Sequence, residues 1–230
     1  MTTTIQISPQ LIAQFNHAAG LVRAGNLDSA LVEWDRLLNP TDEDKQETRV
    51  VTGDFIGQAY MRKAWVLMDL DRHAEAREVF EDEFLQACLG QFDLENLYEY
   101  YFSYANTLGD LAEIEPMDVA FSKAINIAAD HLGDTRRMRL CWNNLLYWAE
   151  KAQAWKYILR EVENCLQYAG NVGDDALAEL AGLNKAYALA RLGRNSEARL
   201  IVNPLMERAR VARTEWVIAR CEEILRAMRN

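Results

Sequence analysis

Three histidines and two acidic clusters are the side chains of this sequence best suited to catalysis or metal binding. His17, His73 and His131 are far apart, and no pair has the H-x3-H or H-E-x-x-H spacing that places two imidazoles on one helix face. The clusters Asp42–Asp44 and Glu81–Glu83 lack the alternating ligand spacing of a calcium loop. The histidines therefore indicate no metal site, and we interpret the acidic clusters as solvated surface.

The sequence also lacks the motifs of nucleophilic and nucleotide chemistry. It contains no G-x-S-x-G, no G-x-G-x-x-G and no glycine-rich phosphate loop. We therefore expect no enzymatic activity and no cofactor. A catalytic pair assembled from distant segments stays an alternative that no residue pattern favours.

The cysteines, the N-terminal segment and the lengths of the apolar runs indicate in which cellular compartment the protein is expected. Cys88, Cys141, Cys165 and Cys221 form no C-x-x-C pair and lie in apolar settings, as expected of reduced, buried thiols. The N-terminus has no basic region before an apolar stretch, and no apolar run reaches about 18 residues. These features predict a cytoplasmic protein without a membrane span.

Composition favours helices and argues against nucleic acid. Half of the 230 residues are apolar, and only 11 glycines and 4 prolines interrupt the chain. The net charge is −10, whereas a protein that binds phosphates needs a basic face.

A frame of five positions recurs along the chain with spacings of 3, 4, 5 and 4 residues. Its three clear copies are Ala18, Leu21, Gly25, Ala30 and Trp34; Ala64, Leu67, Asp71, Ala76 and Phe80; and Ala186, Leu189, Gly193, Ala198 and Val202. A weaker copy is Leu146, Ala149, Gln153, Ile158 and Val162. A further copy has Ala105 and Leu108, then Ala120 and Ala124, and is interpreted as carrying three extra residues around Pro116.

The copies begin at residues 18, 64, 105, 146 and 186, so the period is 40 or 41 residues except for one interval of 46. The long interval contains the polar segment 39–47, which is predicted to be a loop. Each frame predicts two antiparallel helices joined by a short turn, with small residues where the helices cross and bulky residues against the next pair. One such pair cannot bury both of its faces, so the pairs are expected to stack as a solenoid.

Segments 11–40, 57–88 and 179–210 resemble tetratricopeptide repeats, which have the pattern W-x2-L-G-x2-Y followed by A-x3-F and P. Trp142 and Leu145 match the W-x2-L portion in the fourth copy, and Pro40 closes the first. The family period is about 34 residues, so the helices here are expected to be longer by about one turn. The resemblance implies an all-α, right-handed α-α superhelix of about five helical hairpins and a C-terminal capping helix.

The predicted organisation is a single domain over residues 1–230. Its repeats are expected at 9–40, 46–88, 94–131, 135–169 and 174–211, with the capping helix at 213–228. The predicted helices are 9–23, 27–38, 46–69, 72–88, 94–109, 116–131, 135–151, 154–169, 174–192, 195–211 and 213–228. Pro204 is expected to kink or end its helix. The capping helix is expected to start at Thr214 and to bury a stripe of Val217, Cys221, Ile224 and Met228.

In the family that the sequence resembles, the first helix of each pair lines a concave groove that binds peptides or helices. The resemblance places the following positions in such a groove: Phe15, Asn16, Ala19, Arg23, Met61, Arg62, Trp65, Asp69, Phe102, Ser103, Asn106, Asp110, Asn143, Asn144, Tyr147, Lys151, Leu183, Asn184, Tyr187 and Arg191. We single out as candidate partner-binding residues Asn16, Arg23, Arg62, Trp65, Asn106, Asn143, Asn144, Tyr147, Asn184, Tyr187 and Arg191.

Two patterns support these candidates. Asn16, Asn144 and Asn184 occupy the same place in three copies, and a row of amides can grip a peptide backbone of any sequence. The alternative is that these amides are solvated or bonded within the chain. The predicted groove positions also mix aromatic residues with basic ones. A basic lining within an acidic protein would select an acidic peptide or a C-terminal carboxylate. The aromatic run from Tyr98 to Tyr104 is expected to be mostly core.

The leading hypothesis is a non-catalytic, cytoplasmic interaction module: an adaptor, chaperone-like protein or assembly factor that binds a protein or peptide partner. A regulatory module that responds to a ligand or peptide is the second hypothesis, and an enzyme on a helical-repeat scaffold is the third. A self-assembling scaffold is an additional alternative. The open ends of a repeat array make a homo-oligomer a further alternative.

Overall fold

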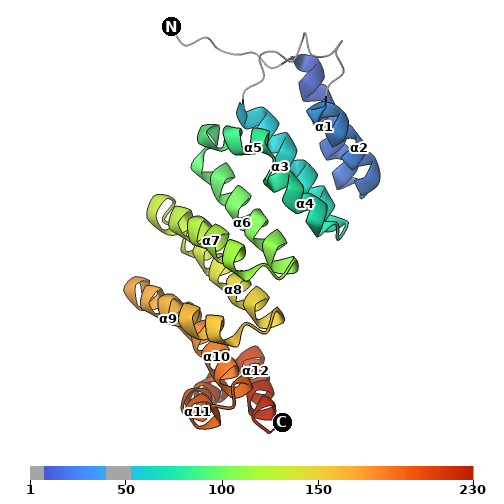
Figure 1. Cartoon of the computed structure of the whole chain (residues 1–230). Helices are drawn as coiled ribbons and strands as arrows, with labels where there is room; N and C mark the ends of the chain where they lie inside the picture. The colour runs from blue at the N-terminus through green and yellow to red at the C-terminus, as the bar shows by residue number, and fades with distance from the viewer. Residues whose placement is uncertain (1–7, 40–52, 230) are drawn as a thin grey trace. The chain divides into compact units, whose positions relative to one another are not determined.

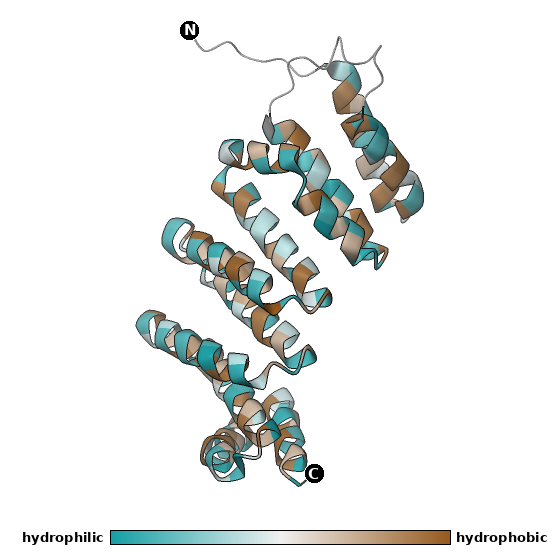
Figure 2. Ribbon diagram, in the orientation of Figure 1, coloured by the Kyte–Doolittle hydropathy of each residue, from teal (hydrophilic) through white to brown (hydrophobic). Residues whose placement is uncertain are grey.

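The computed structural model describes residues 8–39 and 53–229, and within these residues the chain is all-α (Figure 1). It forms two compact units, residues 1–135 and 136–230. Most helices carry both polar and apolar residues along their length, as expected of helices that bury one face (Figure 2). None of the described helices is long and apolar enough to span a bilayer.

The described residues of the N-terminal unit form three helical pairs. Its helices are α1 (Pro9–Arg23), α2 (Leu27–Leu38), α3 (Gly53–Asp69), α4 (His73–Phe80), α5 (Glu83–Cys88), α6 (Leu94–Asp110) and α7 (Ile114–Asn126). A 3-10 turn at Leu89–Gln91 follows α5, and a π-helical turn at Ile127–His131 extends α7. Within the unit, α1 packs on α2, α3 on α4 and α6 on α7.

The C-terminal unit holds two further pairs and one terminal helix. Its helices are α8 (Thr135–Lys151), α9 (Trp155–Val172), α10 (Asp175–Arg191), α11 (Asn195–Ala212) and α12 (Glu215–Ala227). Helix α10 packs on α9 and on α11, and α12 packs on both α10 and α11.

The same turn joins the two helices in all five pairs. The second residue after each first helix has a positive φ of 55–75°. These residues are Gly25, Asp71, Ala112, Gln153 and Gly193. The next residue donates its N–H to the carbonyl five residues earlier, over 2.8–2.9 Å. This is a Schellman motif, which satisfies the open carbonyls at a helix end and reverses the chain direction.

The turns fix the register of the third pair and correct one prediction. Counting from Ala112 at the frame's own spacing leads to Met117 and Phe121, and both are fully buried. The third copy therefore keeps the 3, 4, 5, 4 spacing, and the three extra residues predicted around Pro116 do not exist. Pro116 is the third residue of α7, where its missing N–H costs no helical hydrogen bond.

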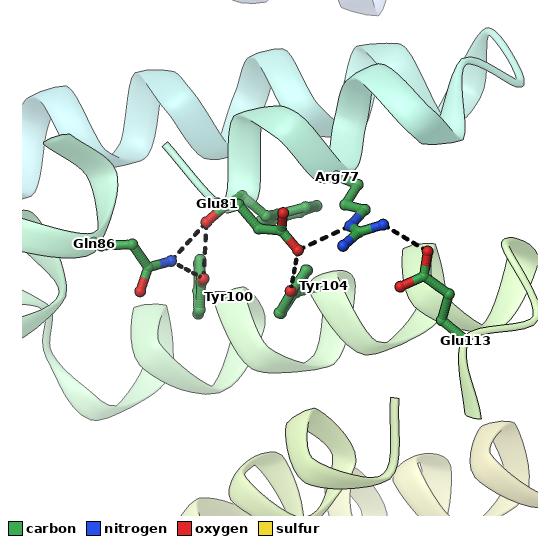
Figure 3. Close-up of polar contacts among 7 residues, drawn as sticks. Arg77, Glu81, Gln86, Tyr100, Tyr104 and Glu113 are labelled. Atoms are coloured by element: carbon green, nitrogen blue, oxygen red, sulfur yellow. Dashed lines mark hydrogen bonds and ion pairs between the residues drawn. The ribbon is translucent and has the colours of Figure 1, made fainter. Parts of the chain in front are cut away.

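A second correction concerns the predicted helix at 72–88, which is two helices. Helix α4 ends at Phe80, and Asp82 caps α5 by accepting the N–H of Phe84 at 2.9 Å. Hydrogen bonds and ion pairs connect the segment between α4 and α5 to α6 (Figure 3). There Tyr100 donates to the carbonyl of Phe80 at 2.9 Å, and Tyr104 donates to Glu81 at 2.6 Å.

This network of contacts continues on both sides of the break between α4 and α5. Arg77 bonds Glu81 at 2.8 Å and Glu113 at 2.6 Å, and Gln86 donates to the carbonyl of Phe80 at 2.6 Å. Burial raises the pKa of the Tyr100 hydroxyl to about 12. The aromatic run was expected to be mostly core, but only Tyr98 and Tyr100 of its aromatic residues are buried. Tyr101, Phe102 and Tyr104 are half-buried, and Tyr104 serves this network.

Of the two outcomes expected at Pro204, a kink or the end of its helix, the structure contradicts the second. Pro204 lies inside α11, which continues to Ala212, so the proline does not end its helix. The predicted stripe of α12 is confirmed, since Val217, Cys221, Ile224 and Met228 are all buried. The four cysteines are likewise buried, and they form no disulfide. Pro40, the polar segment after Asn39 and the predicted start of a helix at residue 46 lie outside the described residues.

Candidate binding surfaces on the first helices

In the N-terminal unit, the candidate residue Trp65 of α3 contacts α6, and Arg62 of α3 lies over its ring. The indole Nε1 of Trp65 donates to the Ser103 hydroxyl at 2.8 Å, which joins the two first helices. The Arg62 guanidinium lies 4.7 Å from the centre of the Trp65 ring. Asn106 donates its Nδ2 to the carbonyl of Phe102 at 2.8 Å.

The other predicted positions of this unit differ in exposure. Asn16 and Arg23 are exposed on α1. Met61 is only 2 % exposed and belongs to the core, so it does not reach the surface. Trp65 already has two partners within the chain, because its indole N–H bonds Ser103 and its ring makes a cation–π contact with Arg62.

The C-terminal unit gathers several candidates around one cavity. We name it the first pocket: it has a volume of about 630 Å³ and is lined by α8, α10 and α12. Its lining residues are Asn143, Tyr147, Glu150, Leu180, Leu183, Asn184, Trp216, Ala219, Arg220, Glu223 and Arg226. Asn143, Tyr147 and Asn184 were predicted from the sequence. Tyr147 and Trp216 are each 55 % exposed, so large aromatic surfaces face solvent here.

A second pocket adjoins the first. It has a volume of about 350 Å³ and is lined by Tyr147, Glu150, Lys151, Gln153, Trp155, Tyr187 and Arg191. Tyr147 and Glu150 line both pockets. The second pocket adds Tyr187 and Arg191 to the candidates that the fold brings together.

Arg220 of α12 connects the elements around both pockets. Its guanidinium lies 4.4 Å from the centre of the Tyr187 ring, bonds Glu223 at 2.7 Å and forms an ion pair with Glu150. Burial opposes the charge of Arg220, but the hydrogen bonds to Glu150 and Glu223 outweigh it and raise the pKa of the guanidinium. The side chain therefore stays charged and links α12 to both α8 and α10.

Two further cations, both of which line the second pocket, lie over aromatic rings. The Arg191 guanidinium lies 5.3 Å from the centre of the Trp155 ring, and Lys151 Nζ lies 4.4 Å from the Trp148 ring. Contacts of this kind hold a cation close to apolar surface without neutralising its charge.

The three asparagines of the predicted row do not form one continuous exposed surface. Asn184 lines the first pocket but is 8 % exposed, and its Nδ2 donates to the carbonyl of Leu180 at 2.9 Å. Asn144 is half-buried and accepts from Asn143 at 3.4 Å, while Asn16 belongs to the other unit. The role of the row in binding therefore stays a prediction.

Seven residues that line the first pocket were not predicted from the sequence. Two of them are Glu150 of α8 and Leu180 of α10, and the other five belong to α12: Trp216, Ala219, Arg220, Glu223 and Arg226. The five on α12 were missed because α12 was interpreted as a cap, and only its buried stripe was considered. The signal was available: Trp216, Arg220 and Glu223 recur at helical spacing on a face other than that stripe. Within residues 8–39 and 53–229, no three His, Cys, Asp or Glu side chains gather as a metal ion would require.

Comparison with known proteins agrees with this geometry. A family model described as tetratricopeptide repeat matches residues 57–82, which cover most of α3, the turn at Asp71 and all of α4. The chain carries a tetratricopeptide repeat. The match contains the whole second copy of the frame, so the other copies repeat the spacing of a true tetratricopeptide unit. No curated protein is similar enough to be counted as a relative. Tetratricopeptide repeats are in general protein–protein interaction modules rather than catalysts.

Proposed function

We propose that this protein is a non-catalytic, cytoplasmic adaptor or assembly factor that binds a peptide segment of another protein. The bound segment lies on the first-helix face of the C-terminal unit, which we define by the two pockets described above. The observation that carries the proposal is the first pocket, where three residues predicted as partner-binding line one cavity of about 630 Å³.

The lining has the chemistry that protein recognition uses. Tyrosine, tryptophan and arginine are enriched at binding hot spots, and all three types line the first pocket. Tyr147 and Trp216 each expose 55 % of their surface, so a ligand could bury a large apolar area against them. The four buried thiols are consistent with a reducing compartment.

Affinity capture followed by mass spectrometry tests this proposal. The bait is the full chain, compared with the variant Tyr147→Ser/Trp216→Ser. The matched control is Leu200→Ser/Val211→Ser, which removes two apolar side chains that are 76 % and 86 % exposed on α11. A partner retained by the wild type and the control, but lost by the pocket variant, supports the proposal. A partner captured equally by all three baits contradicts this placement of the binding face.

A further inference from the structure

The charge of the first-helix face differs in sign from the charge of the protein. Four cationic side chains, Lys151, Arg191, Arg220 and Arg226, and two carboxylates, Glu150 and Glu223, line the two pockets. The face is therefore locally positive, whereas the whole chain carries a net charge of −10. A patch of this kind attracts anionic ligands and repels cationic ones.

The charges are not evenly distributed over the face. Arg220 pairs with both carboxylates, so these three groups form one ionic cluster where the pockets meet. Lys151 and Arg191 lie in the second pocket, each over a tryptophan ring. The second pocket is thus the more cationic of the two, because two cations and one carboxylate line it, whereas two cations and two carboxylates line the first.

The first pocket has a different character. Tyr147 and Trp216 flank it, and Leu180 and Leu183 contribute to its lining. A large apolar side chain could be buried there at about 25 cal/mol for each Å² removed from water. The two pockets share Tyr147 and Glu150, so one short segment of chain could occupy both.

From this geometry we propose that the ligand is an acidic peptide with one large apolar residue. The apolar side chain occupies the first pocket between Tyr147 and Trp216, and a carboxylate of the same peptide binds at Lys151 and Arg191 in the second. This inference rests on the proposed function, and it adds the chemical class of the partner. The ligand class is a peptide because the apolar site and the cationic site are separate, and one chain with two different side chains can occupy both.

The test is selection from a phage-displayed library of random peptides against the full chain. Three variants are panned in parallel. Tyr147→Ser/Trp216→Ser removes the apolar site, and Lys151→Gln/Arg191→Gln removes the cationic site. Arg199→Gln/Arg208→Gln is the control, because it makes the same change of charge at exposed residues of α11.

We expect the wild type and the control to enrich peptides that combine an aromatic or large aliphatic residue with several Asp or Glu residues. The Lys151→Gln/Arg191→Gln variant should lose the acidic preference and keep the apolar one. A synthetic peptide of the selected sequence should bind the wild type at least about tenfold more weakly at high than at low salt, because screening weakens attraction between exposed charges.

Two outcomes would overturn the inference in distinguishable ways. If the wild type enriches neutral or basic peptides, or if the acidic preference survives in Lys151→Gln/Arg191→Gln, the partner class is wrong. The proposed function then stands only if enrichment is still lost in Tyr147→Ser/Trp216→Ser. If the wild type enriches no peptides beyond those that Tyr147→Ser/Trp216→Ser enriches, both the inference and the proposed function are wrong.

Discussion

The guanidinium of Arg220 lies 4.4 Å from the centre of the Tyr187 ring and also bonds Glu150 and Glu223. One side chain of the terminal helix thus contacts α8 and α10 as well as its own helix. Helix α12 buries its apolar stripe on one side and contributes Arg220 and Trp216 to the pockets on another. It therefore closes the C-terminal unit and also builds part of its candidate binding face.

Replacing Arg220 with Met should lower the free energy of unfolding by about 1–2 kcal/mol, because it removes two ion pairs and a cation–π contact in a partly buried setting. Urea unfolding of the two proteins measures the difference. The control is Arg210→Met, whose exposed ion pair with Glu207 spans 3.3 Å and should contribute less than about 0.5 kcal/mol. Equal losses in both variants would show that the Arg220 contacts contribute no more than an exposed ion pair.

At the positive-φ position of these turns, adding a glycine and removing one should have opposite effects on stability. Ala112 has a φ of 59°, where a Cβ is strained, so Ala112→Gly should stabilise the protein, by about 0.5–1 kcal/mol. Gly193 has a φ of 75°, and a Cβ added there would meet no neighbour, so Gly193→Ala should cost about 1 kcal/mol through the backbone alone. Thermal melting of both variants checks the signs. A shift in the same direction for both would contradict the shared turn geometry.

The stability of the α8–α10 contact should depend on pH through Asp174. This carboxylate caps α10 by accepting the N–H of Leu177 at 3.0 Å and pairs with Arg139 at 2.8 Å. Burial opposes ionisation, but the bonds from Leu177 and Arg139 outweigh it and hold the pKa of Asp174 below its usual value. The folded pKa is lower than that of the unfolded chain, so the stabilisation is present above about pH 4 and is lost as the pH falls further.

The variant Asp174→Asn keeps an oxygen for the cap but removes the charge. We expect wild type to melt at a higher temperature than Asp174→Asn at neutral pH, and the gap should shrink as the pH falls below about 4. Asp175→Asn, at the adjacent residue, is the control and should produce a smaller gap. A gap between wild type and Asp174→Asn that does not change with pH would contradict the assigned role of the carboxylate.

Gly57 of α3 allows the close approach of Phe92. A Cβ at Gly57 would overlap Phe92 Cε1, far inside contact distance. We therefore expect Gly57→Ala to destabilise the protein by about 1–3 kcal/mol, and Phe92→Leu in the same chain to restore part of the loss. Gly170→Ala in α9 meets no neighbour and should stabilise by up to about 1 kcal/mol. Chemical denaturation of the three variants gives the values, and a harmless Gly57→Ala would contradict this packing.

Much of the fold could be predicted from the sequence because the repeat is local. The frame marks the helix crossing, the turn and the second helix, so α1, α2 and α8 begin and end where they were predicted. The third copy was misplaced because Met117 stands where the clear copies have an alanine, and the nearby Ala120 and Ala124 were assigned to the frame instead. The break at Glu81 was missed because Asp82 was counted as surface charge, whereas it caps a new helix.

The candidate site was less predictable, because it depends on contacts between helices distant in sequence. Tyr147 and Asn184 could be placed on first helices by analogy, but whether they line one cavity depends on how α8, α10 and α12 pack. The partner of Arg220 on α8 lies 70 residues away in the chain. Helical periodicity shows which face of a helix is apolar, and it does not show which polar face meets which neighbour.

The most direct test of the central claim is photo-crosslinking with a benzophenone amino acid introduced at single positions of the full chain in cells. Position 147 probes the first-helix face, and position 200 on α11 is the matched control, since both side chains are exposed. We predict a discrete crosslinked adduct with a partner protein from position 147 and none from position 200. An adduct from position 200 alone, or no adduct from position 147, would contradict the claim that this protein binds its partner on the first-helix face of its C-terminal unit.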